Sequence, residues 1–450
     1  MALMRREYGQ EQPYIPLGIF KLRLPGIHFG LEVPELIQGL FLIATPMSSF
    51  AAHQEMLGIP FELCILMITL NSLLYELHVC LGDPVSAGWI TPAIPLILAW
   101  GKQFQPGVER IQATICLGYF MGFVFLFMGI TGLAKKVVNI IPNSLRTGII
   151  FGAGVASTIS VFGAGGRMEG VELPILLGIA VCILTMYSVH CLSRVNKNKF
   201  IKLLVNFGML PGMVVAFITA YATGIVPFPG IQMGIIPFHR WPELLQNYTI
   251  FGVGFPPGYI WIKAIPMVIT AYIIAFGDFV FAEVVTKEAD IVREDEVIDY
   301  NGNRSNIISG MRNIILATVA PYGSVLSGPL WGATHVSIVE RYKQGPEAMN
   351  TIYGGLFSLN IALMCGTIFW PLISLFRPCL PIGLSLTMMV QAYACFYISM
   401  EMVNTKEDRG VAGLTGLILA TKGAAWGLAA GIILYFLVGR QKEVKKEIAA

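Results

Sequence analysis

GSVLSGPLWGATHVSIVERY, Gly323 to Tyr342, is a polar interruption between long apolar runs of the chain. Its flanks place it at or near the depth of a membrane, yet its first half holds too many Gly, Ser and Pro residues for an ordinary membrane helix. Interrupted backbone at that depth is tolerated only where the segment is buried in protein or lines a wet cavity. We therefore predict a broken span here, with a half-helix that follows Pro329.

The composition is that of a membrane protein. Of the 450 residues, 55% are hydrophobic and 13% are charged, whereas soluble proteins carry about 25% charged residues. We expect a cytoplasmic N-terminal segment at 1–34, one membrane domain at 35–439 and a basic cytoplasmic tail at 440–450. The eight cysteines form no CxxC or Cys/His cluster, so we predict no disulfide framework, metal site or cofactor. No motif indicates an enzyme or nucleic-acid binding.

The apolar runs predict an all-α polytopic membrane protein, since about 20 apolar residues cross a bilayer. We count fourteen transmembrane segments, near 35–53, 59–79, 84–100, 111–133, 147–163, 172–192, 201–223, 262–286, 306–321, 327–341, 351–376, 380–403, 410–421 and 423–439. An even number places both termini on one side. With that side cytoplasmic, most Lys and Arg residues fall inside, as the positive-inside rule expects. We expect a multi-pass protein of the plasma (inner) membrane.

A second broken segment lies in the first half of the chain. LGDPVSAGWITPAIPLILAWG, Leu81 to Gly101, begins with small and polar residues and ends as an apolar helix. The two broken segments are the third and tenth spans, so each is third in a set of seven. Such a pair is typical of a transporter built from inverted repeats, here about 35–223 and 262–439. The alternative is that these glycines and prolines only kink two close-packed helices.

The two broken segments together predict a solute site. They can pair with each other as short strands, and the half-helices that follow would point their N-termini, each with about +0.5 charge, toward the midplane. We expect Gly88 and Thr334, near the starts of the two half-helices, to bind solute acceptor atoms. Trp89 could stack on a planar solute or simply pack.

Asp278 is the ionisable residue placed deepest in a predicted span. A carboxylate there costs about 2.5–3.5 kcal/mol on insertion scales, so we expect it to face a cavity or a partner. It would bind solute or carry a coupling proton; the alternative is a structural hydrogen bond to a neighbouring helix. Glu283 lies about 140° farther around the helix. It is a weaker candidate for proton coupling and could pair with Lys287 instead.

His335 and Gln38 complete the candidate site. His335 follows Pro329 by six residues, near the start of the half-helix. It could supply a donor or a proton relay and could pair with Asp278, or it could be a satisfied structural group. Gln38, an uncharged polar residue in the first span, could reach the same cavity.

The layout and several motifs resemble the nucleobase–ascorbate transporter family, the uracil/xanthine permeases, whose fold the SulP-type anion transporters share. The similar runs are IPMVITAYIIAFGDFVFAEVVTKEADIV, NRSNIISGMRNIILATVAPYGSVLSGPLWGATH and DPVSAGWITP. The resemblance implies that Asp278 matches the family carboxylate of span 8, and that His335 stands where the family has a second carboxylate. It also implies a core domain (spans 1–4 and 8–11), a gate domain (spans 5–7 and 12–14), an elevator-type mechanism and a homodimer.

Three hypotheses follow. A proton-coupled nucleobase symporter is favoured by Asp278, with a proton or Na⁺ as coupling ion. A SulP-like transporter of small inorganic or organic anions is favoured by His335 in place of a carboxylate and by the paired helix N-termini. A channel or non-transporting membrane scaffold is the alternative from another class, and it predicts that neutralising Asp278 leaves function intact.

Overall fold

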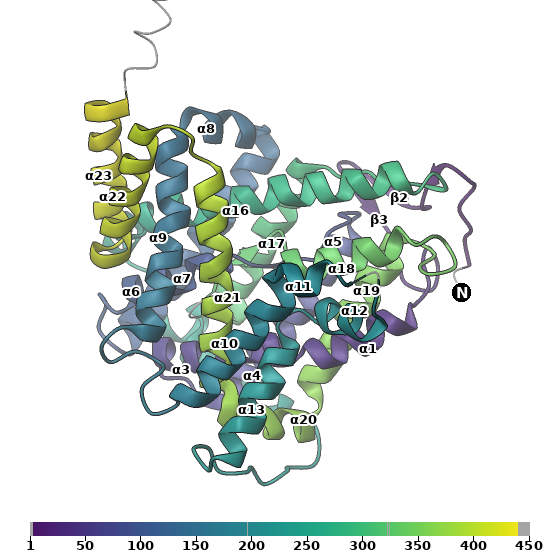
Figure 1. Cartoon of the computed structure of the whole chain (residues 1–450), viewed down its shortest axis with the longest axis horizontal. Helices are drawn as coiled ribbons and strands as arrows, with labels where there is room; N and C mark the ends of the chain where they lie inside the picture. Colours follow the sequence, from purple (N-terminus) through teal and green to yellow (C-terminus); the bar gives the residue numbers. More distant parts are fainter. Residues whose placement is uncertain (1–2, 196, 322, 324, 440–450) are drawn as a thin grey trace, which may run out of the picture.

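The computed structural model describes residues 3–195, 197–321, 323 and 325–439, so the expected basic tail at 440–450 lies outside the described residues. Helices dominate (Figure 1). In the first half, the elements are β1 (Gln10–Glu11), β2 (Ile15–Leu17), β3 (Phe20–Leu22), α1 (Val33–Leu42), α2 (Ala44–Met47), α3 (Phe50–Leu57), α4 (Phe61–Leu74), α5 (Glu76–Cys80), β4 (Gly88–Trp89), η1 (Thr91–Ala93), α6 (Ile94–Gly101), α7 (Val108–Thr131), α8 (Ala134–Ile140), α9 (Asn143–Phe162), α10 (Glu172–Tyr187), α11 (Val189–Leu192), α12 (Lys199–Asn206) and α13 (Leu210–Ala222).

The second half begins with a connection that carries two short helices and then repeats the pattern of long helices around one broken segment. Its elements are η2 (Phe238–Arg240), α14 (Trp241–Tyr248), α15 (Ile250–Val253), α16 (Gly258–Val292), β5 (Glu296–Val297), α17 (Gly302–Val319), β6 (Ser327–Gly328), α18 (Gly332–Tyr342), α19 (Ile352–Ile368), α20 (Trp370–Phe376), η3 (Arg377–Cys379), α21 (Leu380–Glu401), α22 (Lys406–Lys422), α23 (Ala424–Leu434) and the π-helical turn η4 (Tyr435–Gly439).

The long apolar helices make the chain a multi-pass membrane protein. Within the described residues, six helical spans are long and apolar enough to cross a membrane, or seven if the bent pair α12–α13 counts as one. They are Val33–Leu57, Phe61–Cys80, Val108–Thr131, Asn143–Phe162, Gly258–Val292 and Trp370–Glu401. Helices occur at all fourteen predicted positions, but several are shorter than a full span. The number fourteen stays a prediction.

The helices pack in two groups. The first group consists of α1, α4, α5, α7, α16, α17, α18 and α19, and the second of α9, α10, α13, α21, α22 and α23. These are the helices of the predicted core and gate spans. The groups meet where η1, α6 and α16 contact α9 and α21, so the first broken segment lies at the boundary between them.

Glycines allow the closest helix pairs to touch through their backbones, as is common where membrane helices pack. On α1, a Cβ at Gly39 would lie 2.3 Å from the carbonyl oxygen of Leu359 on α19. On α22, a Cβ at Gly416 would lie 2.6 Å from the Gly148 oxygen and 2.8 Å from the Gly152 nitrogen on α9. Each group is therefore held by contacts that leave no room for a methyl group.

The predicted seventh span, 201–223, is not one straight helix. Its two parts, Lys199–Val205 and Leu210–Ala222, are bent by 83° relative to each other. Gly208 in the break has φ of +57°, a left-handed conformation that only glycine adopts readily. The segment is therefore a bent helix pair, and whether it forms one span stays a prediction.

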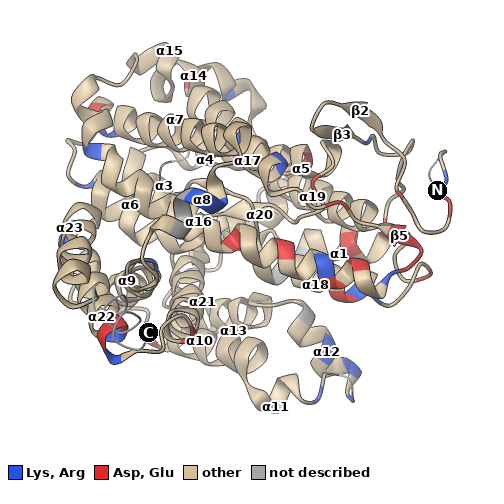
Figure 2. Ribbon diagram, turned by 90° about the horizontal axis from the view of Figure 1, so that it is seen from above, with Lys and Arg blue, Asp and Glu red and all other residues tan. Residues whose placement is uncertain are grey.

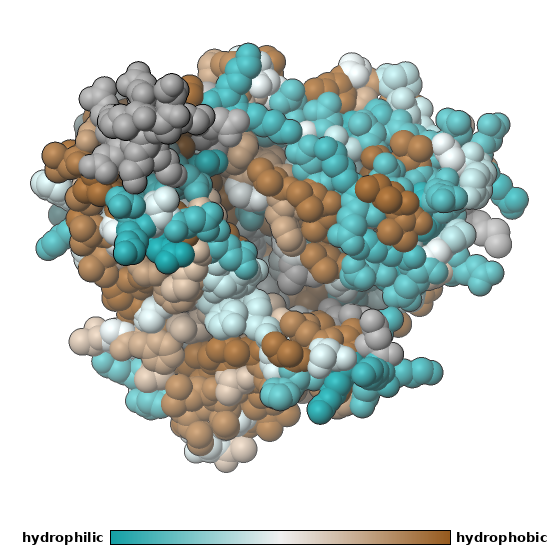
Figure 3. Space-filling view, turned by 45° about the horizontal axis from the view of Figure 1, so that its top comes forward, coloured by the Kyte–Doolittle hydropathy of each residue, from teal (hydrophilic) through white to brown (hydrophobic). Residues whose placement is uncertain are grey.

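An N-terminal arm, residues 3–32, is hydrogen-bonded to the first helix group. Its strand β1 pairs in parallel with β5, and its backbone nitrogen at Arg23 donates to the Cys80 oxygen at 2.8 Å. Figure 3 shows hydrophilic residues gathered at the right, over the end where Figure 1 places the arm, and a surface hollowed between the two helix groups. The arm thus braces the chain just before the first broken segment.

A charged cluster fixes this arm outside the membrane spans. The Arg6 guanidinium lies 2.6 Å from an Asp295 carboxylate oxygen. A hydrogen bond from Arg293 lowers the pKa of Asp295 to about 2. Because this pKa is lower than in a free Asp side chain, the ion pair stabilises the folded arm fully above about pH 4, and that contribution is lost as the pH falls through the folded value.

We expect Gly416→Ala and Gly413→Ala, both on α22, to have opposite effects on stability. Nothing lies within 4 Å of a Cβ at Gly413, so alanine there leaves stability unchanged or slightly higher. Alanine at Gly416 would overlap the α9 backbone and cost about 1–3 kcal/mol. Thermal unfolding of the purified protein in detergent measures both, and equal melting temperatures for the two variants would contradict the close packing of α9 and α22.

Candidate functional site

The two broken segments pair with each other, which confirms the prediction that they would form short strands. Strands β4 and β6 run antiparallel, with Gly88 opposite Gly328 and Trp89 opposite Ser327. We call the place where β4 and β6 pair the crossing. A Cβ at Gly88 would lie 2.6 Å from the Leu330 oxygen, so the crossing requires glycine at this position. Backbone groups of the two interruptions thus bond to each other, which meets the requirement for irregular backbone at membrane depth.

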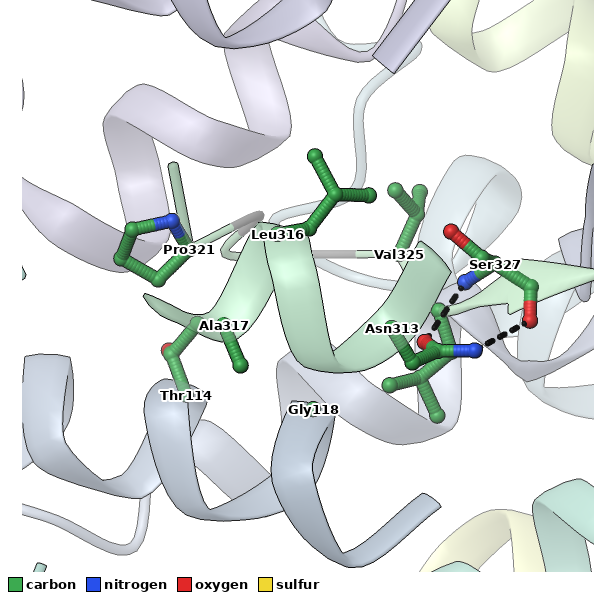
Figure 4. Close-up of a pocket in the computed structure, with 9 residues that line it drawn as sticks. Thr114, Gly118, Asn313, Leu316, Ala317, Pro321, Val325 and Ser327 are labelled. Atoms are coloured by element: carbon green, nitrogen blue, oxygen red, sulfur yellow. Dashed lines mark hydrogen bonds between the residues drawn. The ribbon is translucent and has the colours of Figure 1, made fainter. Parts of the chain in front are cut away.

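Asn313 on α17 extends this strand pair. Its side-chain amide donates to the Ser327 oxygen at 2.9 Å, and its Oδ1 accepts from the Ser327 nitrogen at 3.0 Å (Figure 4). The side chain therefore bonds β6 as a neighbouring strand would. A cavity of about 10 Å³ lies beside it, between α7, α17 and the residues Pro321 and Val325–Ser327, with room for about one water molecule.

Arg312 joins the two strands of the crossing through hydrogen bonds. Its guanidinium donates to the Gly328 oxygen at 3.0 Å and to the Gly88 oxygen at 3.2 Å, one carbonyl from each strand. It also lies 4.7 Å from the centre of the Tyr75 ring, and its side chain is 0% exposed. Arg312 was not among the site residues predicted from the sequence, and it lies in the middle of α17.

The charge of Arg312 is balanced by Asp83 through a histidine. Arg312 Nη1 lies 3.3 Å from His78 Nε2, and His78 Nδ1 lies 2.7 Å from Asp83 Oδ2. A guanidinium can only donate, so Nε2 is the accepting nitrogen and Nδ1 carries the proton that is donated to Asp83. All three side chains are fully buried. The hydrogen-bonded series Arg312–His78–Asp83 therefore carries no net charge and lies next to the two strands.

His335 lies at the crossing but does not pair with Asp278. Its Nδ1 accepts from the Ser86 nitrogen at 3.3 Å, and its Nε2 lies 3.2 Å from Thr286 Oγ1. Because a backbone amide only donates, Nδ1 is unprotonated and Nε2 donates to the hydroxyl. The Ser86 oxygen in turn accepts from the Trp331 nitrogen at 2.7 Å. In this conformation His335 bridges the first broken segment to α16, and both of its ring nitrogens are occupied.

Both half-helices begin at this crossing. Among the described residues, no side chain caps the start of Thr91–Gly101 or of α18. Thr334, in the first turn of α18, is buried. The buried hydroxyl groups of Ser86, Ser309 and Ser327 have no hydrogen-bond partner within the part of the chain that the structure describes. Uncapped helix N-termini and unsatisfied hydroxyls at one place form a region that can bind a polar solute.

Asp278 is half-buried and lies on α16, a helix that contacts α9 and α23 of the second group. Within the described residues, no hydrogen-bond donor or cation reaches its carboxylate. The expected alternative of a structural bond to a neighbouring helix is therefore not what the described residues show, and the carboxylate is available to a solute or a proton.

The remaining candidates lie at different places. Glu283 pairs with Lys287 at 2.7 Å and with Lys135 at 3.1 Å, so its carboxylate is neutralised as the sequence suggested. Gln38 donates to Ser337 Oγ on α18 at 3.1 Å, which joins α1 to the second half-helix. Trp89 is half-buried on β4. Among the described residues, no group of three His, Cys, Asp or Glu side chains could hold a metal ion.

Comparisons with known proteins add only distant likenesses. A scan against models of protein families matches none, and a search of curated proteins finds no match. The transmembrane domain of a cyanobacterial bicarbonate transporter, BicA, is 14% identical with a TM-score of 0.48, over 88% of this chain and 96% of that one. The murine anion transporter Slc26a9, in its inward-facing state, is 13% identical with a TM-score of 0.49, over 91% of this chain and 68% of that one. The resemblance to nucleobase permeases stays a prediction.

We expect Arg312→Gln to destabilise the protein strongly. The change leaves two strand carbonyls without their donor and the Asp83 charge without its counter-ion, and breaking a buried pair in this way costs about 3–5 kcal/mol. Arg312→Lys should recover little, because an ammonium cannot bridge both carbonyls as a planar guanidinium does. The control is Arg377→Gln, whose side chain is 44% exposed. Thermal unfolding that is equally affected in all three variants would show that the crossing does not depend on Arg312.

Proposed function

We propose that the chain is a membrane transporter that binds a small anion where its two broken segments cross. The observation that carries the proposal is the antiparallel pair β4–β6. Arg312 donates a hydrogen bond to each strand, and each strand is followed by a half-helix whose start has no side-chain cap. Each helix N-terminus offers unpaired N–H groups and a partial positive charge. The binding energy would come from these amides and nearby hydroxyls.

Asp278 would carry a proton when the anion is bound. Arg312 is already balanced by Asp83, so an ionised Asp278 would be an uncompensated negative charge beside a negative solute. A charged carboxylate inside a membrane is costly without a partner, and the described residues provide none. Protonation removes both penalties, so we propose that anion and proton move together. Glu283, with two lysine partners, is the weaker candidate for this role.

The position of the site suggests how transport would proceed. η1 and α16 contact α9 and α21 of the second group, so the solute would sit at the boundary between core and gate. Sliding of the core against the gate would expose it to alternate sides, as an elevator does. The homodimer and a Na⁺-coupled alternative stay predictions.

A proton-coupled nucleobase symporter is the second candidate, and the same unpartnered carboxylate favours it. Asp278 could accept hydrogen bonds from the ring N–H groups of a nucleobase while the half-helix amides bind its carbonyl oxygens. The two candidates differ in which solute the crossing recognises, so a ligand panel separates them.

We expect the purified protein to be stabilised by at least one small anion and by no nucleobase. The panel contains sulfate, oxalate and bicarbonate, the last because BicA is described as a bicarbonate transporter, beside uracil and xanthine. A ligand at a hundred times its dissociation constant stabilises the folded state by about 2.7 kcal/mol. Thermal unfolding at constant pH and ionic strength measures the shift.

Two variants make the panel decisive. Asp278→Asn mimics the protonated acid and should keep the anion-induced shift, while Glu283→Gln, on the same helix, serves as the matched control. A shift with a nucleobase that Asp278→Asn abolishes would overturn anion binding and favour the symporter of nucleobases. No shift with any ligand of either class would contradict a solute site at the crossing.

Asp278→Asn should also separate binding from coupling. In proteoliposomes, we expect wild-type uptake of the stabilising anion to accelerate when the outside is more acidic than the inside. In Asp278→Asn this acceleration should be lost, while exchange of labelled for unlabelled anion at equal pH persists. Unchanged acceleration by the pH gradient in Asp278→Asn would contradict proton coupling at this residue.

A further inference from the structure

The segment α11–α12 forms an exposed ledge on the second helix group. α12 is bent by 83° from α13, so it lies almost parallel to the membrane surface if α13 crosses the membrane. Its side chains Phe200 and Leu203 are 65% and 52% exposed. Val189 and Leu192 on α11 are exposed as well. Exposed apolar side chains on a helix at this angle indicate insertion into the bilayer interface.

Basic side chains are interleaved with these apolar ones. Arg194, Lys197, Lys199 and Lys202 lie within nine positions of the chain, and no Asp or Glu occurs between residues 173 and 242. None of the four forms an ion pair with the described residues. Figure 2 shows α12 at the edge of the molecule, with basic residues on it and no acidic residue nearby.

The local structure keeps these cations available. The Asn198 side chain accepts from the nitrogens of Phe200 and Ile201, so it caps the start of α12 and fixes the direction in which the helix leaves the turn. Arg194, Lys197 and Lys199 are exposed and Lys202 is half-buried. The cations and the apolar side chains therefore belong to one surface.

We propose that the α11–α12 ledge binds anionic phospholipid. The phosphate groups would accept hydrogen bonds from Arg194, Lys197, Lys199 and Lys202, while Phe200 and Leu203 contact the upper part of the acyl chains. A bilayer surface supplies both the negative charge and the apolar layer that this surface needs. A soluble acidic partner would match the cations but leave the apolar side chains in water. The site lies apart from the strand crossing and does not depend on the transported solute.

The test compares lipid bound to the intact, purified protein. Native mass spectrometry after incubation with equimolar phosphatidylglycerol and phosphatidylcholine counts the lipids retained. We expect wild-type protein to retain phosphatidylglycerol preferentially, and the triple variant Lys197→Gln, Lys199→Gln, Lys202→Gln to bind it about tenfold more weakly or worse, since each cation near the surface contributes separately.

A matched control removes the same charge elsewhere. Lys102, Lys135 and Lys343 each pair with a glutamate, and their joint replacement by Gln should leave phosphatidylglycerol binding close to wild type. Equal loss in both triple variants would mean that net charge alone attracts the lipid and would overturn a site on the ledge. Full retention by the ledge variant, or displacement of the lipid by inorganic phosphate at the same concentration, would overturn it too.

A second substitution tests the apolar half of the surface. Phe200→Ser keeps every cation and should still reduce retention of phosphatidylglycerol, because the acyl contact is lost. Thermal unfolding of each variant without added lipid shows whether the fold is intact. If Phe200→Ser retains as much lipid as wild type, only the cations bind, and the lipid-interface geometry of α12 is wrong.

Discussion

Backbone amide and carbonyl groups that interrupt a membrane helix must find partners inside the protein, and the rest of this structure is arranged around that requirement. The strands β4 and β6 bond to each other. Arg312 donates to one carbonyl of each strand, and the Asn313 side chain bonds to the Ser327 backbone of β6. Because one strand comes from the first half of the chain and the other from the second, pairing of their backbones also joins the two halves. The solute site proposed at their crossing would then be a consequence of how the interruption is stabilised.

The buried guanidinium creates a second requirement, since an isolated cation at this depth is very costly. Asp83 provides the counter-charge, but it acts through His78, whose tautomer is fixed by the donor on one side and the carboxylate on the other. His335 is fixed in the same manner by a backbone amide and a hydroxyl. Each of these two histidines is thus held in one tautomer, which suits a site that must keep its shape while the surrounding helices move.

Several features were predictable from sequence because they follow from composition along the chain. Apolar runs locate the long helices, and matched Gly/Pro interruptions locate the two strands that pair. Arg312 was missed because charge counting treats every arginine near a polar loop as a loop residue. The signal was present: Ser309, Arg312 and Asn313 share a polar face within helix 302–319. The bend before α13 was missed because it depends on the backbone conformation of one glycine, Gly208.

In the proposed transporter, a solute at the crossing would meet partial charges rather than a full one. Arg312 and Asp83 cancel, and the amides of the half-helices and the serine hydroxyls are what remains. Binding by such groups would select a solute, yet it would leave no buried ion at the crossing unpaired when the solute departs. Asp278 is the exception, and it lies on α16 at the boundary with the second group, where the environment changes if the groups slide. Under the proposed mechanism, a proton there would be gained on one side and lost on the other without disturbing the paired strands, so a fixed binding site and a variable charge would coexist in one membrane domain.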